Sequence, residues 1–226
     1  MLQVAKELKP DRIIVLGDFA DFFALSKYDK NPNRASNLEY EVGLVAEGLD
    51  ELDAIGAKHK QYIAGNHEDR LERYLMSSAP ELFNLVKLAE ILKLKERGWG
   101  YTPYKAYYKL GCIVYTHDLG KAGKYAVHAA LADAQNSVII GHTHRLGYIV
   151  EGDATGVQKI GFCPGWLGDL SAIDYKHQLL ANRQWALGFG IGYLNHATGY
   201  TYFQPVPILR HKHAYSCVVG GKFYSL

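Results

Sequence analysis

The stretch IIVLGD at residues 13–18 sets the pattern that decides the fold. Four apolar residues, rich in Ile and Val, are followed at once by a glycine and an aspartate, as at the end of a buried strand. The same arrangement recurs three times, with an apolar run leading into a turn that carries potential metal-binding side chains. These further stretches are YIAGNHE at 62–68, CIVYTHD at 112–118 and VIIGHTH at 138–144.

Segments with helical periodicity lie between these runs. Residues 37–55 carry apolar side chains at helical spacing, and residues 69–94 predict two helices with a break near Pro80. Residues 124–135 predict another helix, and residues 2–9 a short one before the first run. Because strands and helices alternate, we expect an α/β fold.

The second part of the chain has a different pattern. From Leu146 onward, short strands alternate with glycine-rich turns, which is typical of antiparallel sheets. The predicted strands are Tyr148–Glu151, Gln158–Phe162, Ala186–Leu194, Tyr200–Val206 and Ser216–Phe223. We expect them to form a second sheet packed on the first. Since no linker separates the two parts, residues 1–226 are predicted to form one domain.

Composition narrows the class of protein only slightly. The chain has 226 residues, 48% of them hydrophobic, and a formal net charge of +2, which gives no sign of a dedicated electrostatic nucleic-acid binder. Its three cysteines are odd in number and far apart, so neither a disulfide framework nor a zinc motif is indicated. Without a signal-peptide pattern or a membrane-length apolar run, we expect a soluble cytoplasmic protein with no membrane partner.

The polar residues at the four strand ends predict a metal site. In open α/β sheets, functional groups gather beyond the carboxyl ends of the strands. Glycine at these points lets the backbone turn sharply. The candidate ligands are Asp18, Asn66, His117, His142 and His144. Imidazole nitrogen combined with carboxylate and amide oxygen suits Mn²⁺, Fe or Zn²⁺.

Each of these residues also has a purely structural explanation. Asp18 could be a helix N-cap or a turn residue, and residues 66–68 could be a capped helix start. His117 taken alone is more often a structural histidine, and a turn could carry His142 and His144 without a ligand. However, all of these explanations would have to hold in order at four consecutive strand ends, which favours the metal site.

Taken in order, these residues resemble the signature of the calcineurin-like metallophosphoesterases. The resemblance rests on Gly17-Asp18, on Gly65-Asn66-His67-Glu68, on His117 and on Gly141-His142-Thr143-His144, and it spans residues 11 to 145. The wider context in LGDFADFF, GNHEDRLERYL and GHTHRLG is similar to phage-type members. It implies a two-layer β-sandwich of mixed sheets flanked by helices. It also implies two divalent metal ions, with Mn²⁺ first and Fe or Zn²⁺ as alternatives.

The resemblance also implies a role for each site residue. Asp18 would bridge the two metals, and His144 would bind the second. The first metal would be completed by Asn66, His117 and His142. His67 would bind no metal and would instead protonate the leaving oxygen, since the unperturbed pKa of histidine lies near working pH.

The implied activity is hydrolysis of a phosphoester bond by attack of a metal-bound hydroxide. The substrate would be a phosphorylated small molecule or a nucleic acid, and the phage-like context favours a phosphodiesterase or nuclease. Arg145, directly after the last of these histidines, is the best candidate contact for the substrate phosphate. Arg70 and Arg73 are further candidates, although they could equally pair with Glu68 and Glu72 on a solvated helix.

The sequence departs from the family pattern at its start. Members carry an Asp-x-His motif on a strand before the Gly-Asp block, and residues 1–16 contain none. Without those ligands, we expect one metal to bind well, the second weakly, and turnover to be low. The alternative function is therefore a metal-binding remnant that acts as an interaction module. A structural protein without metal is the third alternative.

Overall fold

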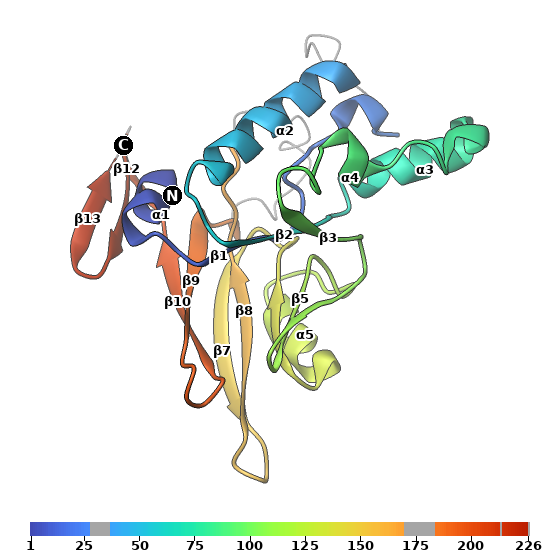
Figure 1. Ribbon diagram of the computed structural model, residues 1–226. Helices are drawn as coiled ribbons and strands as arrows, with labels where there is room; N and C mark the ends of the chain where they lie inside the picture. Colours follow the sequence, from blue (N-terminus) through green and yellow to red (C-terminus); the bar gives the residue numbers. More distant parts are fainter. Residues whose placement is uncertain (28–36, 170–183, 213, 226) are drawn as a thin grey trace. The chain divides into compact units, whose positions relative to one another are not determined.

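The chain forms a mixed α/β protein with several open sheets. The computed structural model describes residues 1–27, 37–169, 184–212 and 214–225, and the chain divides into two compact units, residues 1–106 and 107–226 (Figure 1). The expected single metallophosphoesterase domain over residues 1–226 stays a prediction. Within the described ranges, every helix is too short or too polar to cross a membrane.

The first unit is built on a three-stranded parallel sheet in the order β1-β2-β3. Its strands are β1 (Arg12–Val15), β2 (His59–Ile63) and β3 (Trp99–Thr102). Its helices are α1 (Leu2–Leu8), η1 (Phe23–Leu25), α2 (Leu38–Asp53), α3 (Asp69–Ser78), η2 (Pro80–Leu82) and α4 (Leu88–Ile91). Ile14 lies opposite Gln61 in the β1–β2 register, so both strands end at the same edge.

The long helix α2 supplies much of the core of the first unit. It begins at Asn37, whose side chain accepts a hydrogen bond of 2.7 Å from the Tyr40 N–H and so caps the first turn. Val45, Leu49 and Leu52 lie on its buried face, as the helical spacing predicts. These side chains join a core cluster that also contains residues of β2, α3 and β3.

The second unit is built on a five-stranded sheet in the order β4-β5-β6-β8-β7. Its strands are β4 (Tyr108–Leu110), β5 (Ile113–Thr116), β6 (Ser137–Ile140), β7 (Leu146–Gly152) and β8 (Gln158–Pro164). The three central strands are parallel, and β4 and β7 are antiparallel edges. Helix α5 (Ala126–Ala134) buries Val127, Ala130 and Leu131 in a cluster with Val138 and Ile140 of β6.

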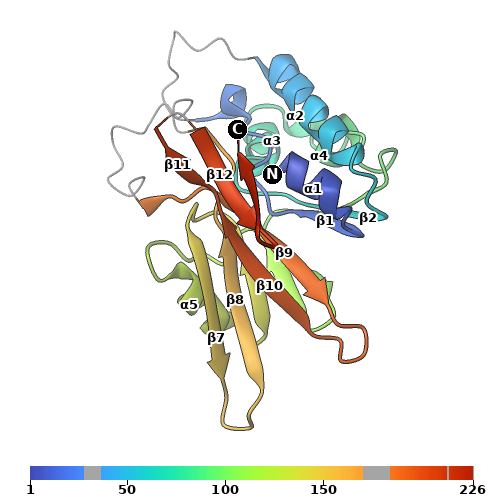
Figure 2. The same ribbon diagram turned by 90° about the vertical axis from the view of Figure 1, so that its left-hand side faces the viewer.

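Two further antiparallel sheets complete the second unit (Figure 2). One is the hairpin of β9 (Gly188–Leu194) and β10 (Thr201–Pro207). The other contains β11 (Leu209–His211), β12 (Ala214–Val219) and β13 (Lys222–Ser225). The prediction of antiparallel strands after Leu146 is therefore confirmed.

The structure corrects three details of the expected strands and sheets. The four strands that lead into the predicted ligands do not share one sheet, because β1 and β2 pair in the first unit and β5 and β6 in the second. Strands β7 and β8 join the sheet of β5 and β6 instead of starting a new one. The single strand expected over Ser216–Phe223 is a hairpin, because Gly220 and Gly221 both have positive φ and turn the chain.

Candidate metal centre

Asp18 lies in a sharp turn directly after β1. Gly17 and Asp18 have φ angles of 86° and 54°. Glycine enters this left-handed region freely, and aspartate enters it more readily than most residues. The backbone therefore reverses direction at the end of the strand.

The turn after β2 lies directly against the Asp18 turn. A Cβ atom at Gly65 would overlap the backbone nitrogen and the Oδ1 atom of Asp18, so only glycine fits there. The His67 N–H donates a hydrogen bond of 3.0 Å to Asp18 Oδ1. The turns that carry Asp18 and Asn66 are thus held side by side at the carboxyl edge of the parallel sheet.

Glu68 lies beneath these two turns and is 1% exposed. Its carboxylate accepts hydrogen bonds from the N–H groups of Asp18, Phe19, Ala20 and Gly65 and from the Tyr62 hydroxyl. Burial, together with the neighbouring Glu68 charge, raises the pKa of Tyr62 well above its usual value. The Tyr62 hydroxyl therefore stays protonated and keeps donating to Glu68.

His67 is held by a carboxylate on one side of its ring. Its Nδ1 atom lies 2.9 Å from Asp21 Oδ1, and Arg70 donates to the same oxygen at 2.9 Å and to the Asp21 carbonyl at 2.7 Å. The Nε2 atom of His67 lies 3.9 Å from Asp18 Oδ2. Because Asp21 accepts at Nδ1, the second ring nitrogen is directed toward the carboxylate that the sequence predicts as a metal ligand.

The arginines of α3 have partners other than the predicted ones. Arg70 pairs with Asp21, as described above. Arg73 pairs with Asp69 at 2.9 Å and donates to the Asn66 carbonyl at 2.9 Å. Both side chains therefore support the turns after β1 and β2.

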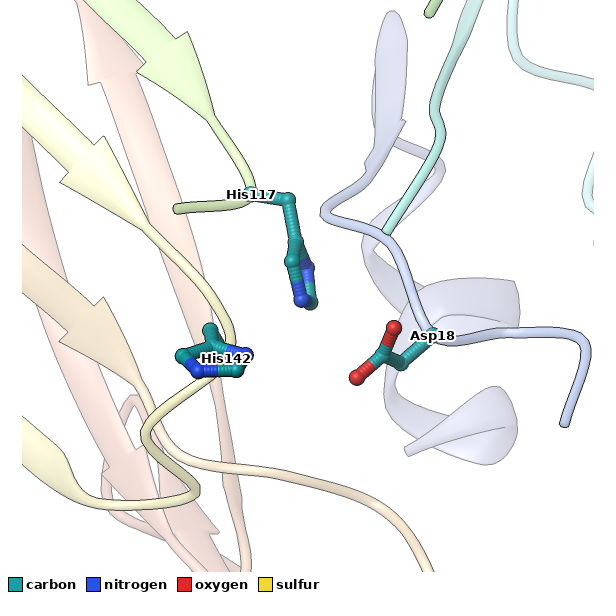
Figure 3. Close-up of side chains that lie close together, drawn as sticks. All are labelled: Asp18, His117 and His142. Atoms are coloured by element: carbon teal, nitrogen blue, oxygen red, sulfur yellow. The ribbon is translucent and has the colours of Figure 1, made fainter. Parts of the chain in front are cut away.

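In the second unit, two histidines lie at the ends of neighbouring parallel strands. His117 follows β5 and His142 follows β6, and the Gly141 N–H donates to the His117 carbonyl at 3.0 Å. The ring centroids are 5.2 Å apart, and the potential ligand nitrogens lie within 4.8 Å of each other. Figure 3 draws both rings on the loops that follow these strands, together with the Asp18 side chain of the first unit. Two imidazole nitrogens at this separation suit a shared cation.

His144 has a different environment from the other two histidines. Its ring is stacked on Trp166 at 5.0 Å with an interplanar angle of 14°, and Trp185 meets it edge-on at 4.4 Å. Arg145 donates to Gln184 Oε1 at 3.0 Å and 3.3 Å. Arg145, the predicted substrate contact, is therefore hydrogen-bonded to the Gln184 side chain, next to the rings of His144, Trp166 and Trp185.

A buried thiol supports the loop that carries His142. Cys163 Sγ lies 3.3 Å from Thr143 Oγ1 and donates to the Gly141 carbonyl at 3.5 Å. Burial raises the pKa of this thiol. All three cysteines are free, with Cys112 exposed and Cys217 buried.

Each unit thus gathers part of the predicted ligand set. The first holds Asp18 and Asn66 on touching turns with His67 beside them, and the second holds the His117–His142 pair. Sequence reasoning missed Asp21 and Glu68, although Asp21 stands only three residues after Asp18 and Glu68 ends the GNHE stretch. Comparison of the chain with protein-family models, curated proteins and solved structures returned no match.

Proposed function

We propose that this chain is a metal-dependent hydrolase of phosphoester bonds, with the fold of the calcineurin-like metallophosphoesterases. The observation that carries the proposal is the His117–His142 pair, because two imidazoles at adjacent strand ends with nitrogens within 4.8 Å suit a cation. Asp18 and Asn66 of the first unit would complete this site. A second, weaker metal would use Asp18 and His144.

The donor chemistry favours a borderline divalent cation. Imidazole nitrogens, a carboxylate and an amide oxygen suit Mn²⁺ best, with Fe or Zn²⁺ as alternatives. When bound, such a cation would draw charge from phosphoryl oxygens and lower the pKa of a coordinated water. Since the sulfur of Cys163 is turned toward Gly141 and Thr143, it does not join this donor set.

His67 would act as the general acid. The acid would be the imidazolium form of His67, in which Nδ1–H donates to Asp21 and the proton to be transferred is on Nε2, the atom nearer Asp18. Arg70 holds Asp21 in place and thereby fixes the orientation of the imidazole. A proton given from Nε2 to the leaving oxygen would complete cleavage of the phosphoester.

The substrate would be a phosphodiester, either a small molecule or a nucleic acid. Arg145 would contact its phosphate oxygens, since a guanidinium can donate two parallel hydrogen bonds to them. The amide of Gln184 already orients this guanidinium.

The test measures metal binding and turnover on the same preparations. Calorimetry with Mn²⁺ and Zn²⁺ is combined with assays on a nitrophenyl phosphodiester, a nitrophenyl phosphomonoester and a short oligonucleotide. We expect His142→Ala to lose metal affinity and turnover together. His128→Ala, which removes a histidine with a 55% exposed side chain on α5, is the matched control and should change neither.

Each outcome selects one alternative. Metal binding without turnover on any substrate would point to a metal-binding interaction module. Absence of Mn²⁺ and Zn²⁺ binding would overturn the hydrolase and the module together.

A further inference from the structure

We infer that Glu68 is a positioning residue for metal binding. Its carboxylate fixes the turn that carries Asp18 against the turn that carries Asn66. The inference rests on the proposed function, in which Asp18 and Asn66 are ligands. All the groups involved belong to the first unit.

The two oxygens of Glu68 accept hydrogen bonds from different sets of donors. Oε2 accepts from the N–H of Asp18 at 2.9 Å and from that of Gly65 at 2.7 Å, so one atom joins both turns. Oε1 accepts at 2.8 Å, 2.9 Å and 2.7 Å from the Phe19 N–H, the Ala20 N–H and the Tyr62 hydroxyl. Segments almost fifty residues apart in sequence are therefore bound to a single side chain.

A carboxylate is required at this position, and a neutral amide of the same size is not sufficient. Five donors converge on a side chain that is 1% exposed, and each buried donor needs an acceptor. A glutamine offers one acceptor oxygen, and its NH₂ group would face at least two N–H donors in either orientation. The turn at Asp18 would then move away from Gly65, and the two ligands would lose their common position.

The competing explanation is that Glu68 only stabilises the fold of the first unit. Asp53 provides a control, because it is another carboxylate with several donors in the same unit, although its side chain is 24% exposed. It accepts from Lys60 at 2.6 Å, from Trp99 at 2.8 Å and from Arg97 at 2.8 Å. None of these donors lies on the turns after β1 or β2. A general loss of stability should therefore affect both variants, and a loss of positioning only one.

The experiment compares wild type, Glu68→Gln, Asp53→Asn and Asp18→Ala. Mn²⁺ affinity is measured by calorimetry, and the coordination of the ion by electron paramagnetic resonance, at a temperature where circular dichroism shows each variant folded. We expect Glu68→Gln to lower the affinity about 10- to 100-fold, as loss of a residue behind the ligands does. Asp53→Asn should stay within about twofold of wild type although it melts at a lower temperature.

The outcomes separate this inference from the proposed function. If wild type binds no Mn²⁺, or if Asp18→Ala binds it like wild type, the proposed site is wrong. If Asp18→Ala loses the ion and Glu68→Gln keeps wild-type affinity, only the positioning role is overturned. If Glu68→Gln does not fold, Glu68→Asp takes its place, since it keeps the charge but cannot reach both turns. Wild-type affinity in Glu68→Asp would overturn the inference in the same way.

Discussion

Asp21 stands three residues after Asp18, and it links the Asp18 turn to the imidazole of His67. The same carboxylate oxygen also accepts from Arg70, so an ion pair orients the ring. A histidine held in this way has a fixed ring orientation, which a proton donor needs. In the proposed function, this arrangement would keep the acid–base role of His67 separate from metal binding.

His67→Ala should therefore lower turnover without removing the metal. We expect a loss of about 10²- to 10⁴-fold in kcat, the usual contribution of a general acid, with Mn²⁺ affinity unchanged within about twofold. Asp21→Asn should give a smaller loss, because the imidazole remains but no carboxylate holds its orientation. Steady-state kinetics and calorimetry on the same samples measure both quantities. Parallel losses of turnover and metal affinity in His67→Ala would make His67 a ligand.

At the scale of the elements, the contact between the turns after β1 and β2 depends on Gly65. We expect Gly65→Ala to destabilise the chain by about 1–3 kcal/mol, since the added methyl overlaps the backbone of Asp18. It should also weaken Mn²⁺ binding. Urea unfolding and calorimetry measure the two effects.

Gly43→Ala provides the control for that variant. Gly43 lies on the exposed side of α2, and an added Cβ meets no atom within 4 Å. Alanine there should stabilise the helix by about 0.5–1 kcal/mol and leave metal binding unchanged. A Gly65→Ala variant as stable as Gly43→Ala would show that the two turns are not packed as described.

Local patterns predicted the elements of this fold better than their pairing. Each of the apolar runs at 13–16, 62–64, 112–116 and 138–140 overlaps a strand to within one residue, because a buried strand and its end can be recognised from neighbouring residues alone. The division of these strands between two sheets could not be predicted in this way, since strand pairing depends on residues far apart in the sequence. The break near Pro80 was visible for the same local reason.

The sequence predicted the candidate ligands, whose residue types are typical of metal sites, but not the residues that support them. Histidines and an aspartate after glycine at strand ends indicate ligands, and His117 and His142 do lie together. The part that Glu68 plays behind the two turns could not be predicted, because three of its five donors, the N–H groups of Asp18, Phe19 and Ala20, are almost fifty residues away in sequence. Asp21 has an ordinary turn context, and only the fold brings it to His67.

At the scale of the whole molecule, a cluster of charges stabilises the first unit. Asp53 at the end of α2 accepts from Lys60 of β2, from Trp99 of β3 and from Arg97. Burial by itself would raise the pKa of Asp53, but the hydrogen bonds from these three residues outweigh it and hold the pKa below its ordinary value of 3.8. The ionised carboxylate is thus favoured in the folded state.

This pKa shift makes stability depend on pH in a defined direction. A carboxyl whose pKa is lowered by folding stabilises the protein above its unfolded pKa, and the contribution disappears as pH falls through the folded pKa. Metal-free wild type should exceed Asp53→Asn in free energy of unfolding by about 1–3 kcal/mol near pH 6. That margin should shrink below about pH 4. Urea unfolding at a series of pH values measures it.

Asp11→Asn is the control for this series. The Asp11 side chain is 81% exposed and pairs with Lys58, which is 78% exposed. Its removal should change stability by less than about 1 kcal/mol at every pH. A margin for Asp53→Asn that grows as the pH falls would contradict the assigned charge state of Asp53.

All three thiols lie in the second unit, so their chemical labelling reports on the opening of that unit. Residues 1–106 contain no cysteine, and of the three in the rest of the chain only Cys112 is exposed. An alkylating reagent should therefore modify the native chain rapidly once, and twice more only as the second unit opens. Mass spectrometry can count these steps.

Because Cys163 contacts the loop that carries His142, its labelling can also report on metal binding. Its sulfur contacts the loop that carries His142, whereas Cys217 lies in the separate sheet of β11, β12 and β13. Since a bound cation stabilises the state that binds it, Mn²⁺ should slow alkylation of Cys163 more than that of Cys217. The ratio of the two labelling rates then measures occupancy of the histidine pair within a single mass spectrum, with no substrate and no activity assay.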